Sequence, residues 1–236
     1  MKSNSELPDA TFATKFDLRC QSEYLAASKD LSDRTPEVSI LNFFRRIDEA
    51  LAVAKTDTHS PPVCAKSCSF CCFLKVQVSA LEAIMIARYV SESFKPHKIR
   101  EVVQRAQANA LEVKGLSQDE HSALNQQCAF LDDGTCSIYS VRPSECRKYH
   151  SVDIEVCRAT YEQPSNLNIP AAYSIEVAEA GQGTKVGFEA ATKFAGFDQR
   201  EYEINSAFLE AMRVPNLSVR LQSGKKTLKT AKVIDP

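Results

Sequence analysis

The chain has 236 residues, of which 44% are hydrophobic and 25% are charged, so it can bury a sizeable core without disulfides. Its formal net charge is only -1, which argues against nucleic acid and against an anionic membrane as partners. We therefore expect the partner to be a protein or a small-molecule substrate.

Cysteine usage depends on the cellular compartment. The first thirty residues mix charges and lack the apolar run of a signal peptide, and no later window approaches the length of a membrane span. We therefore expect a cytoplasmic protein, whose ordinary thiols stay reduced. In such a protein, nine cysteines favour metal ligands or redox groups over disulfides.

Composition divides the chain into three parts. Residues 1–36 are polar with scattered apolar side chains, and we expect a loosely ordered N-terminal arm in which Cys20 is incidental. Residues 37–213 are expected to form a single metal-binding helical domain. Residues 214–236 are basic and predict a solvated, disordered tail.

Several helices are indicated within the central part. Residues 37–55 place apolar side chains at three- and four-residue steps, which predicts an amphipathic helix. A short extended segment follows the cysteine cluster, and Ser79 with Glu82 forms a capping box that predicts the next helix start. Pro96 predicts the first turn of another helix, which Gly115 ends.

The later segments complete the predicted fold. An Asp-Gly pair between two short apolar runs predicts a tight hairpin that presents Cys128 and Cys136 from its two limbs. Residues 169–197 are helical in pattern, although Gly181 and Gly183 predict an interruption. The predicted fold class is mainly α, a compact helical domain with a small cysteine-bearing hairpin region that closes around a metal site.

The cysteines fall into two groups. The stretch CAKSCSFCC puts four thiols into nine residues, and eight of the nine cysteines lie between Cys64 and Cys157. A closed metal site commonly draws its ligands from two distant segments, as these groups would supply. The adjacent Cys71 and Cys72 point in different directions, so we expect more than one metal, or a cluster with an additional thiol.

Spacing favours an iron-sulfur cluster over zinc. Zinc sites usually use two short knuckles, whereas only Cys68 and Cys71 form one here. Iron-sulfur sites tolerate irregular spacing better. Cys157 lies at helical spacing from Ile154, which leaves its role open between metal ligand and packing. The candidate metal ligands are Cys64, Cys68, Cys71, Cys72, Cys128, Cys136, Cys146 and Cys157.

The ordered set of motifs resembles a known family. CAKSCSFCC followed by CAFLDDGTCSIYSVRPSECR is similar to the zinc- or iron-chelating domain family named for its CxxCxxCC motif. The resemblance implies that the metal-binding set contains Cys64, Cys68, Cys71, Cys72, Cys128, Cys136 and Cys146. The chain has one extra residue between Cys64 and Cys68, so Cys64 departs most from the family pattern.

The resemblance also suggests an enzyme. The cysteine pattern is similar to that of flagellin lysine N-methylases, which associate it with an iron-sulfur cluster and S-adenosylmethionine. An iron-sulfur, S-adenosylmethionine-dependent protein-lysine N-methylase-like activity is therefore the alternative, although no glycine-rich motif for S-adenosylmethionine supports it.

Two further enzyme classes share parts of the pattern. Cys64, Cys68, Phe70 and Cys71 satisfy the spacing of radical S-adenosylmethionine enzymes, but the β/α alternation of their barrel is missing. Cys68 and Cys71 could form a dithiol redox pair, but its usual βαβ context is also missing.

Overall fold

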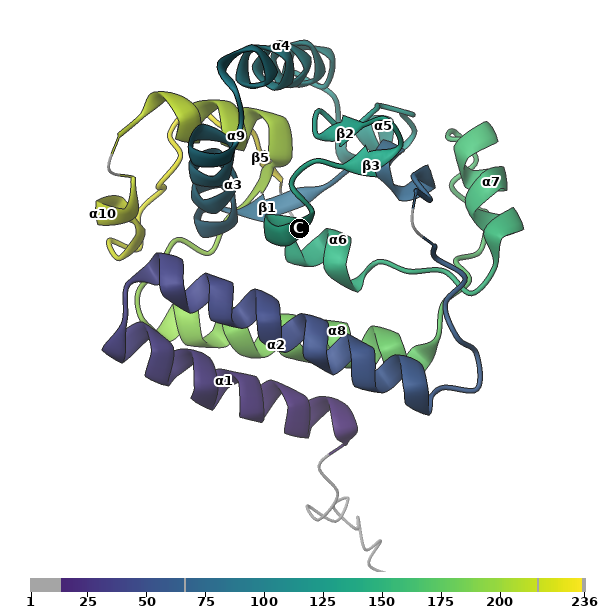
Figure 1. Cartoon of the computed structure of the whole chain (residues 1–236), viewed down its shortest axis with the longest axis horizontal. Coiled ribbons are helices and arrows are strands. Elements are labelled where there is room, and N and C mark those ends of the chain that lie inside the picture. Colours follow the sequence, from purple (N-terminus) through teal and green to yellow (C-terminus); the bar gives the residue numbers. More distant parts are fainter. Residues whose placement is uncertain (1–13, 66, 216, 235–236) are drawn as a thin grey trace, which may run out of the picture.

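The structure is a computed structural model that describes residues 14–65, 67–215 and 217–234. It is mainly helical, which confirms the predicted fold class (Figure 1). The helices are α1 Lys15–Asp33, α2 Pro36–Asp57, α3 Ala80–Ser93, α4 Pro96–Glu112, α5 Gln118–Ser122, α6 Ser144–Lys148, α7 Ile154–Glu162, α8 Ile175–Phe194, α9 Ile204–Arg213 and α10 Ser218–Leu221. Short 3-10 turns and strands complete the fold: η1 Phe70–Phe73, η2 Tyr139–Val141, β1 Gln77–Ser79, β2 Leu131–Asp132, β3 Thr135–Cys136, β4 Glu201–Glu203 and β5 Val233–Ile234.

Three long helices, α1, α2 and α8, lie side by side in one layer, seen at the bottom of Figure 1. The apolar face of α2 supplies Ile40, Phe43 and Ile47 to the core, each almost fully buried. Phe43 stacks on Phe188 of α8, with ring centroids 4.1 Å apart. The spacing of apolar residues in the sequence therefore predicted α2 correctly.

The first helix corrects the expected N-terminal arm. Thr14 and Asp17 form a capping box that starts α1, and Glu23 is buried in the layer. Arg46 of α2 donates two hydrogen bonds of 2.7 Å to the Glu23 carboxylate. A loosely ordered arm is therefore wrong for residues 15–33, whereas residues 1–13 lie outside the described part.

Glycines let the helices of this layer approach closely. A Cβ atom at Gly187 would lie 2.4 Å from the backbone oxygen of Cys20, and one at Gly183 would lie 3.2 Å from the side chain of Arg19. A Cβ atom at Gly181 would lie 2.8 Å from the Cβ of Lys148 on α6. The expected interruption at Gly181 and Gly183 is wrong, because these positions serve close packing along a continuous α8.

A small antiparallel sheet closes the other side of the core. Its strand order is β1-β4-β5, with Tyr202 of β4 paired to both Val78 and Val233. Leu221 and Leu228, between α9 and β5, are fully buried. A disordered tail is therefore wrong for the described residues 217–234.

Glu210 of α9 ties down the segment that leads into β5. Its carboxylate accepts hydrogen bonds from the backbone N–H groups of Lys229, Thr230 and Ala231, at 2.6 to 2.8 Å. The Thr230 hydroxyl donates a further bond to the same group. The sequence of this segment is basic, yet the Glu210 carboxylate binds its backbone N–H groups.

Local signals for the middle helices are confirmed. Ser79 and Glu82 form the predicted capping box of α3, and Pro96 occupies the first turn of α4. Gly115 follows α4 with a φ of 83°, which glycine adopts without strain. Ser117 caps α5.

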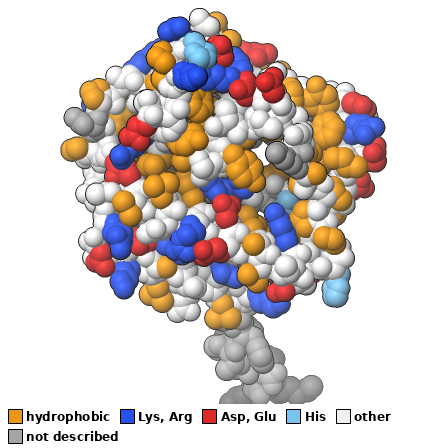
Figure 2. All heavy atoms as spheres, viewed as in Figure 1, with side chains coloured by type: hydrophobic (Ala, Val, Ile, Leu, Met, Phe, Trp, Pro, Cys, Tyr) orange, Lys and Arg blue, Asp and Glu red, His pale blue; other side chains and the backbone are white. Residues whose placement is uncertain are grey.

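The surface matches the small net charge. On the face in Figure 2, acidic and basic side chains are interspersed, and hydrophobic side chains gather near its middle. Within residues 14–65, 67–215 and 217–234, no helix combines the length and the apolarity needed to cross a membrane.

Candidate metal centre

The predicted cysteine hairpin is present. Leu131 of β2 pairs with Cys136 of β3, and the turn between them uses Asp133 and Gly134, both with positive φ. Two successive left-handed residues define the hairpin turn that Asp-Gly favours. Cys136 lies on the second limb, and the carbonyl of Cys128, just before the first limb, accepts a hydrogen bond from Leu131.

The first cysteine segment forms a compact loop against this hairpin. The backbone N–H of Cys68 donates to the carbonyl of Ala65, at 3.1 Å, and η1 carries Cys71 and Cys72. The turn of the hairpin faces this loop, since a Cβ atom at Gly134 would lie 4.0 Å from the backbone oxygen of Ser67. The two cysteine segments therefore lie side by side.

Four thiols are neighbours in this arrangement. Cys146 lies on α6, and burial raises its pKa well above the usual range, with further increases from the thiols of Cys128, Cys136 and Cys71. These electrostatic effects place the four thiols in one region of the structure. A hydrogen bond to Cys72 and burial also raise the pKa of Cys71. We call Cys71, Cys72, Cys128, Cys136 and Cys146 the inner cysteines.

Backbone N–H groups are directed at two inner sulfurs. Burial raises the pKa of Cys128 to about 11, and a hydrogen bond from the Phe130 N–H opposes this rise. Burial likewise raises the pKa of Cys136, and the N–H of Ile138 opposes it. In both cases the donor lies two residues after the cysteine. Such donors stabilise the negative sulfur and fix its orientation.

Arginines supply positive charge around the inner cysteines. Arg142 and Arg147 lower the pKa of Cys136, and Arg105 lowers that of Cys128, although burial prevails at both thiols. Arg147 is itself held by Asp48 and stacks over the ring of Phe44, 4.3 Å from its centroid. Positive charge in this position offsets part of the repulsion between thiolates.

Three more cysteines lie at the outer edge of the same region. Burial raises the pKa of Cys157 on α7, and the neighbouring thiols of Cys64, Cys68 and Cys71 raise it further. Cys64 is exposed to solvent. We call Cys64, Cys68 and Cys157 the outer cysteines, and Cys71 adjoins both sets.

An aromatic cluster explains why Cys157 faces the cysteine loop. The ring of Tyr161 on α7 packs against Phe70 and Phe73 of η1, with centroids 5.7 and 4.9 Å apart. Ser151, just before α7, lowers the pKa of the Cys157 thiol and so opposes the effect of burial. Sequence reasoning missed Tyr161 and Ser151, although Tyr161 lies four residues after Cys157 and hence on the same helix face.

The structure brings the candidate ligands into one region without forming a finished coordination sphere. Within the described residues, no group of three or more His, Cys, Asp or Glu side chains has the arrangement of a metal site. The assignment of individual ligands therefore stays a prediction. Cys20 lies on α1, where its pKa is raised by burial and by Asp17.

These features define a helical domain with converging cysteine segments. Residues 63–169, less than half of the chain, match the family model CxxCxxCC, described as "Putative zinc- or iron-chelating domain". The match includes all eight cysteines of the inner and outer sets. Comparison with curated proteins and with solved structures finds no match.

Proposed function

We propose that this protein binds iron, as an iron-sulfur cluster, or zinc through its two cysteine segments, with the iron-sulfur cluster favoured. The observation that carries the proposal is the set of neighbouring thiols of Cys71, Cys128, Cys136 and Cys146. The matched family description, a zinc- or iron-chelating domain, supports metal binding in general.

The donor chemistry suits either metal. Thiolates are the preferred ligands of iron-sulfur clusters and of structural zinc. The inner cysteines would hold the metal, and the N–H groups of Phe130 and Ile138 would keep two of the sulfurs oriented. The cysteine side chains must move to close around the metal, since the described thiols do not form a coordination sphere.

Cysteine spacing favours iron-sulfur, because zinc sites usually use two short knuckles and only Cys68 and Cys71 form one here. One zinc ion or one iron-sulfur cluster takes four ligands, whereas the inner and outer sets together contain eight cysteines. Cys71 adjoins both sets. The outer cysteines would therefore either bind a second metal centre or cover the first one at its solvent side. When bound, an iron-sulfur cluster supplies one-electron transfer, whereas zinc supplies structural stability.

Anaerobic purification tests the proposal. The protein is isolated without oxygen, and its iron, zinc and acid-labile sulfide are measured together with its absorption spectrum. We expect a brown protein in which iron and sulfide are present in equal amounts. A colourless protein with stoichiometric zinc and no sulfide would reject the iron-sulfur form and keep the zinc form. A protein without bound metal that also fails to take up either metal would reject both.

A further inference from the structure

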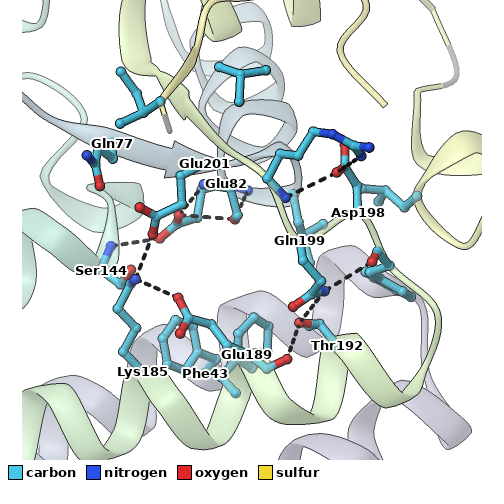
Figure 3. A pocket seen from close by; sticks show the side chains of 18 residues that line it. Phe43, Gln77, Glu82, Ser144, Lys185, Glu189, Thr192, Asp198, Gln199 and Glu201 are labelled. Atoms are coloured by element: carbon cyan, nitrogen blue, oxygen red, sulfur yellow. Dashed lines mark hydrogen bonds and ion pairs between the residues drawn. The ribbon is translucent and has the colours of Figure 1, made fainter. Parts of the chain in front are cut away.

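A cavity of about 520 Å³ lies between α8, α3 and the three-stranded sheet, with Ser144 of α6 in its lining (Figure 3). Its volume falls within the range of pockets that hold small molecules. Figure 3 shows Glu82 and Glu201 on one wall, Glu189 and Thr192 opposite them, and Gln199 at one end.

A buried lysine occupies one corner of the cavity. The Nζ atom of Lys185 contacts carboxylate oxygens of Glu189, Glu201 and Glu145, at 2.5, 2.8 and 3.1 Å. Glu145 is also paired with Lys148, at 3.0 Å. Three carboxylates therefore share two ammonium groups, and the cluster has an excess of one negative charge.

The other acidic side chains of the lining already have partners. Glu82 accepts hydrogen bonds from the backbone of Ser79 and from Ser144, and its negative charge has no cation among these partners. Asp198 is balanced by Arg200 and accepts a further bond from the Tyr202 hydroxyl. The unbalanced charge of the cavity therefore lies at Glu82, which has no cation among its partners, and at Glu189 and Glu201, which share Lys185.

The lining also contains apolar and aromatic side chains, beside the polar Gln77, Thr192 and Gln199. Phe43 and Phe188 both line the cavity, and their rings are nearly parallel, with 11° between the ring planes. Leu81, Leu221 and Ile234 add aliphatic surface. Aromatic faces attract cations that have been removed from water, and they also pack well against a flat apolar group.

We propose that this cavity binds a small organic cation, an ammonium group carried on an apolar body, with Glu189 and Glu201 recognising the charge and the Phe43–Phe188 pair contacting the body. A metal ion is a poorer match, because the Lys185 ammonium already lies between the Glu189 and Glu201 carboxylates. Burial raises the pKa of Glu189 although Lys185 lies beside it, so Lys185 offsets only part of the desolvation of this carboxylate. A second cation would stabilise the charged form of Glu189 further.

This inference does not rest on the proposed metal centre. The two regions are nevertheless adjacent, because the Ser144 N–H donates a 2.8 Å hydrogen bond to Glu82 and Cys146 follows two residues later on α6. The cavity can therefore be tested on the protein as purified, whatever metal it contains.

Three probes of similar size and different charge provide the test: phenethylammonium, 2-phenylethanol and 3-phenylpropionate. Binding to the full chain is measured at pH 7.5 by isothermal calorimetry and by thermal shift. We expect the cation to bind at least about tenfold more tightly than the alcohol, and the carboxylate to bind most weakly. Equal binding of cation and alcohol, or no binding of the cation at millimolar concentration, would overturn the proposal.

Matched variants then locate the site. Glu189→Gln and Glu201→Gln keep the side-chain shape and remove the charge, so each should weaken phenethylammonium binding about tenfold or more. Glu155→Gln is the control, since its side chain is 68% exposed on α7, outside the cavity lining. Circular dichroism confirms that each variant is folded. Unchanged affinity in both folded cavity variants would exclude this cavity as the binding site.

Discussion

The backbone N–H of Cys128 donates a 2.8 Å hydrogen bond to the carbonyl oxygen of Cys72. This bond joins the two cysteine segments through the main chain, independently of their thiols. The segments are therefore positioned before any ligand bond forms, and a metal needs to order side chains rather than the backbone. Loss of one ligand should consequently affect the whole centre without unfolding the protein.

We predict that Cys136→Ser releases metal from the inner cysteines as a group. The substitution removes a soft ligand and leaves a hydroxyl that binds iron and zinc poorly. We expect metal content to fall by more than half and the metal-linked stability to fall by about 3 kcal/mol, roughly 6–12 °C in Tm for a chain of this size. Metal analysis and calorimetry measure the two effects.

Cys20→Ser is the matched control, because Cys20 lies on α1 outside both cysteine sets. It should change neither metal content nor the visible spectrum. If Cys136→Ser retains its metal while Cys68→Ser loses it, the first cysteine segment binds metal alone and the centre formed by both segments is wrong.

Metal binding should release protons. Burial raises the pKa of Cys128 to about 11 and that of Cys146 well above its usual value, so both thiols are protonated at pH 7 in the metal-free protein. A metal must displace these protons, and we expect roughly one proton per cysteine ligand. Affinity should therefore fall as pH falls, because protons compete with the metal.

Calorimetric titration of the metal-free protein with zinc, in two buffers of different ionisation enthalpy, counts these protons. Equal heats in the two buffers would show that zinc binds without displacing protons from thiols. That result would contradict cysteine ligation by the inner set.

Glu210 should contribute stability that is lost in acid. Burial alone would raise its pKa, but the hydrogen bonds from Thr230 and from the backbone of residues 229–231 lower it overall. A carboxyl group whose pKa is lower in the folded state stabilises that state above its unfolded pKa, here 4.5, and loses this contribution as pH falls through the folded value.

Glu210→Gln should therefore lower the free energy of unfolding by about 2 kcal/mol at pH 7 and by less below pH 4. Urea unfolding at several pH values measures the difference from the unsubstituted protein. Glu49→Gln, an exposed carboxylate on α2, should show no comparable loss at neutral pH. A Glu210→Gln effect that does not change with pH would contradict the role of the charge.

The Gly187→Ala substitution should have two opposing effects on the free energy of unfolding, one through helix propensity and one through packing. Alanine favours the helix by about 1 kcal/mol over glycine, whereas overpacking a tight contact costs about 1–3 kcal/mol. The added Cβ would lie 2.4 Å from the backbone oxygen of Cys20, so α1 as a whole must shift. We expect packing to prevail, with a net loss of about 1–2 kcal/mol in unfolding free energy.

Lys193→Ala is the corresponding control at an exposed position near the end of α8, and its unfolding free energy should stay close to that of the unsubstituted protein. A rise in Tm for Gly187→Ala would show that α1 and α8 are less closely packed than the structure indicates.

Local signals in the sequence predicted the fold where a short stretch determines its own conformation. The capping box of Ser79 and Glu82 and the Asp-Gly turn of the cysteine hairpin are confirmed, because each depends on neighbouring residues. The helix α1 was missed although Thr14 and Asp17 form a local capping box, because its buried face is completed by distant partners, Arg46 of α2 and the glycines of α8. Glycine spacing alone does not distinguish an interruption from a close contact.

The candidate site was predictable in part for the same reason. Cysteine density pointed to two cysteine segments, and the structure places these segments side by side. Burial of Cys146 and the contacts of Tyr161 depend on how α6 and α7 pack, which no local pattern specifies. The cavity combines Phe43, Glu82, Lys185 and Glu201, residues far apart in the chain, and so left no motif.

Because α1 packs against α8, α1 cannot complete its packing until α8 has been synthesised. Residues 15–33 leave the ribosome early, but α8 begins roughly 160 residues later in the chain. At typical translation rates, α1 and α2 wait roughly 8–30 s for α8, and the face of α1 that packs on α8 is still in water. Nascent chains that stop before residue 175 should therefore be cleaved readily within residues 15–33, and chains that extend past residue 194 should resist cleavage there.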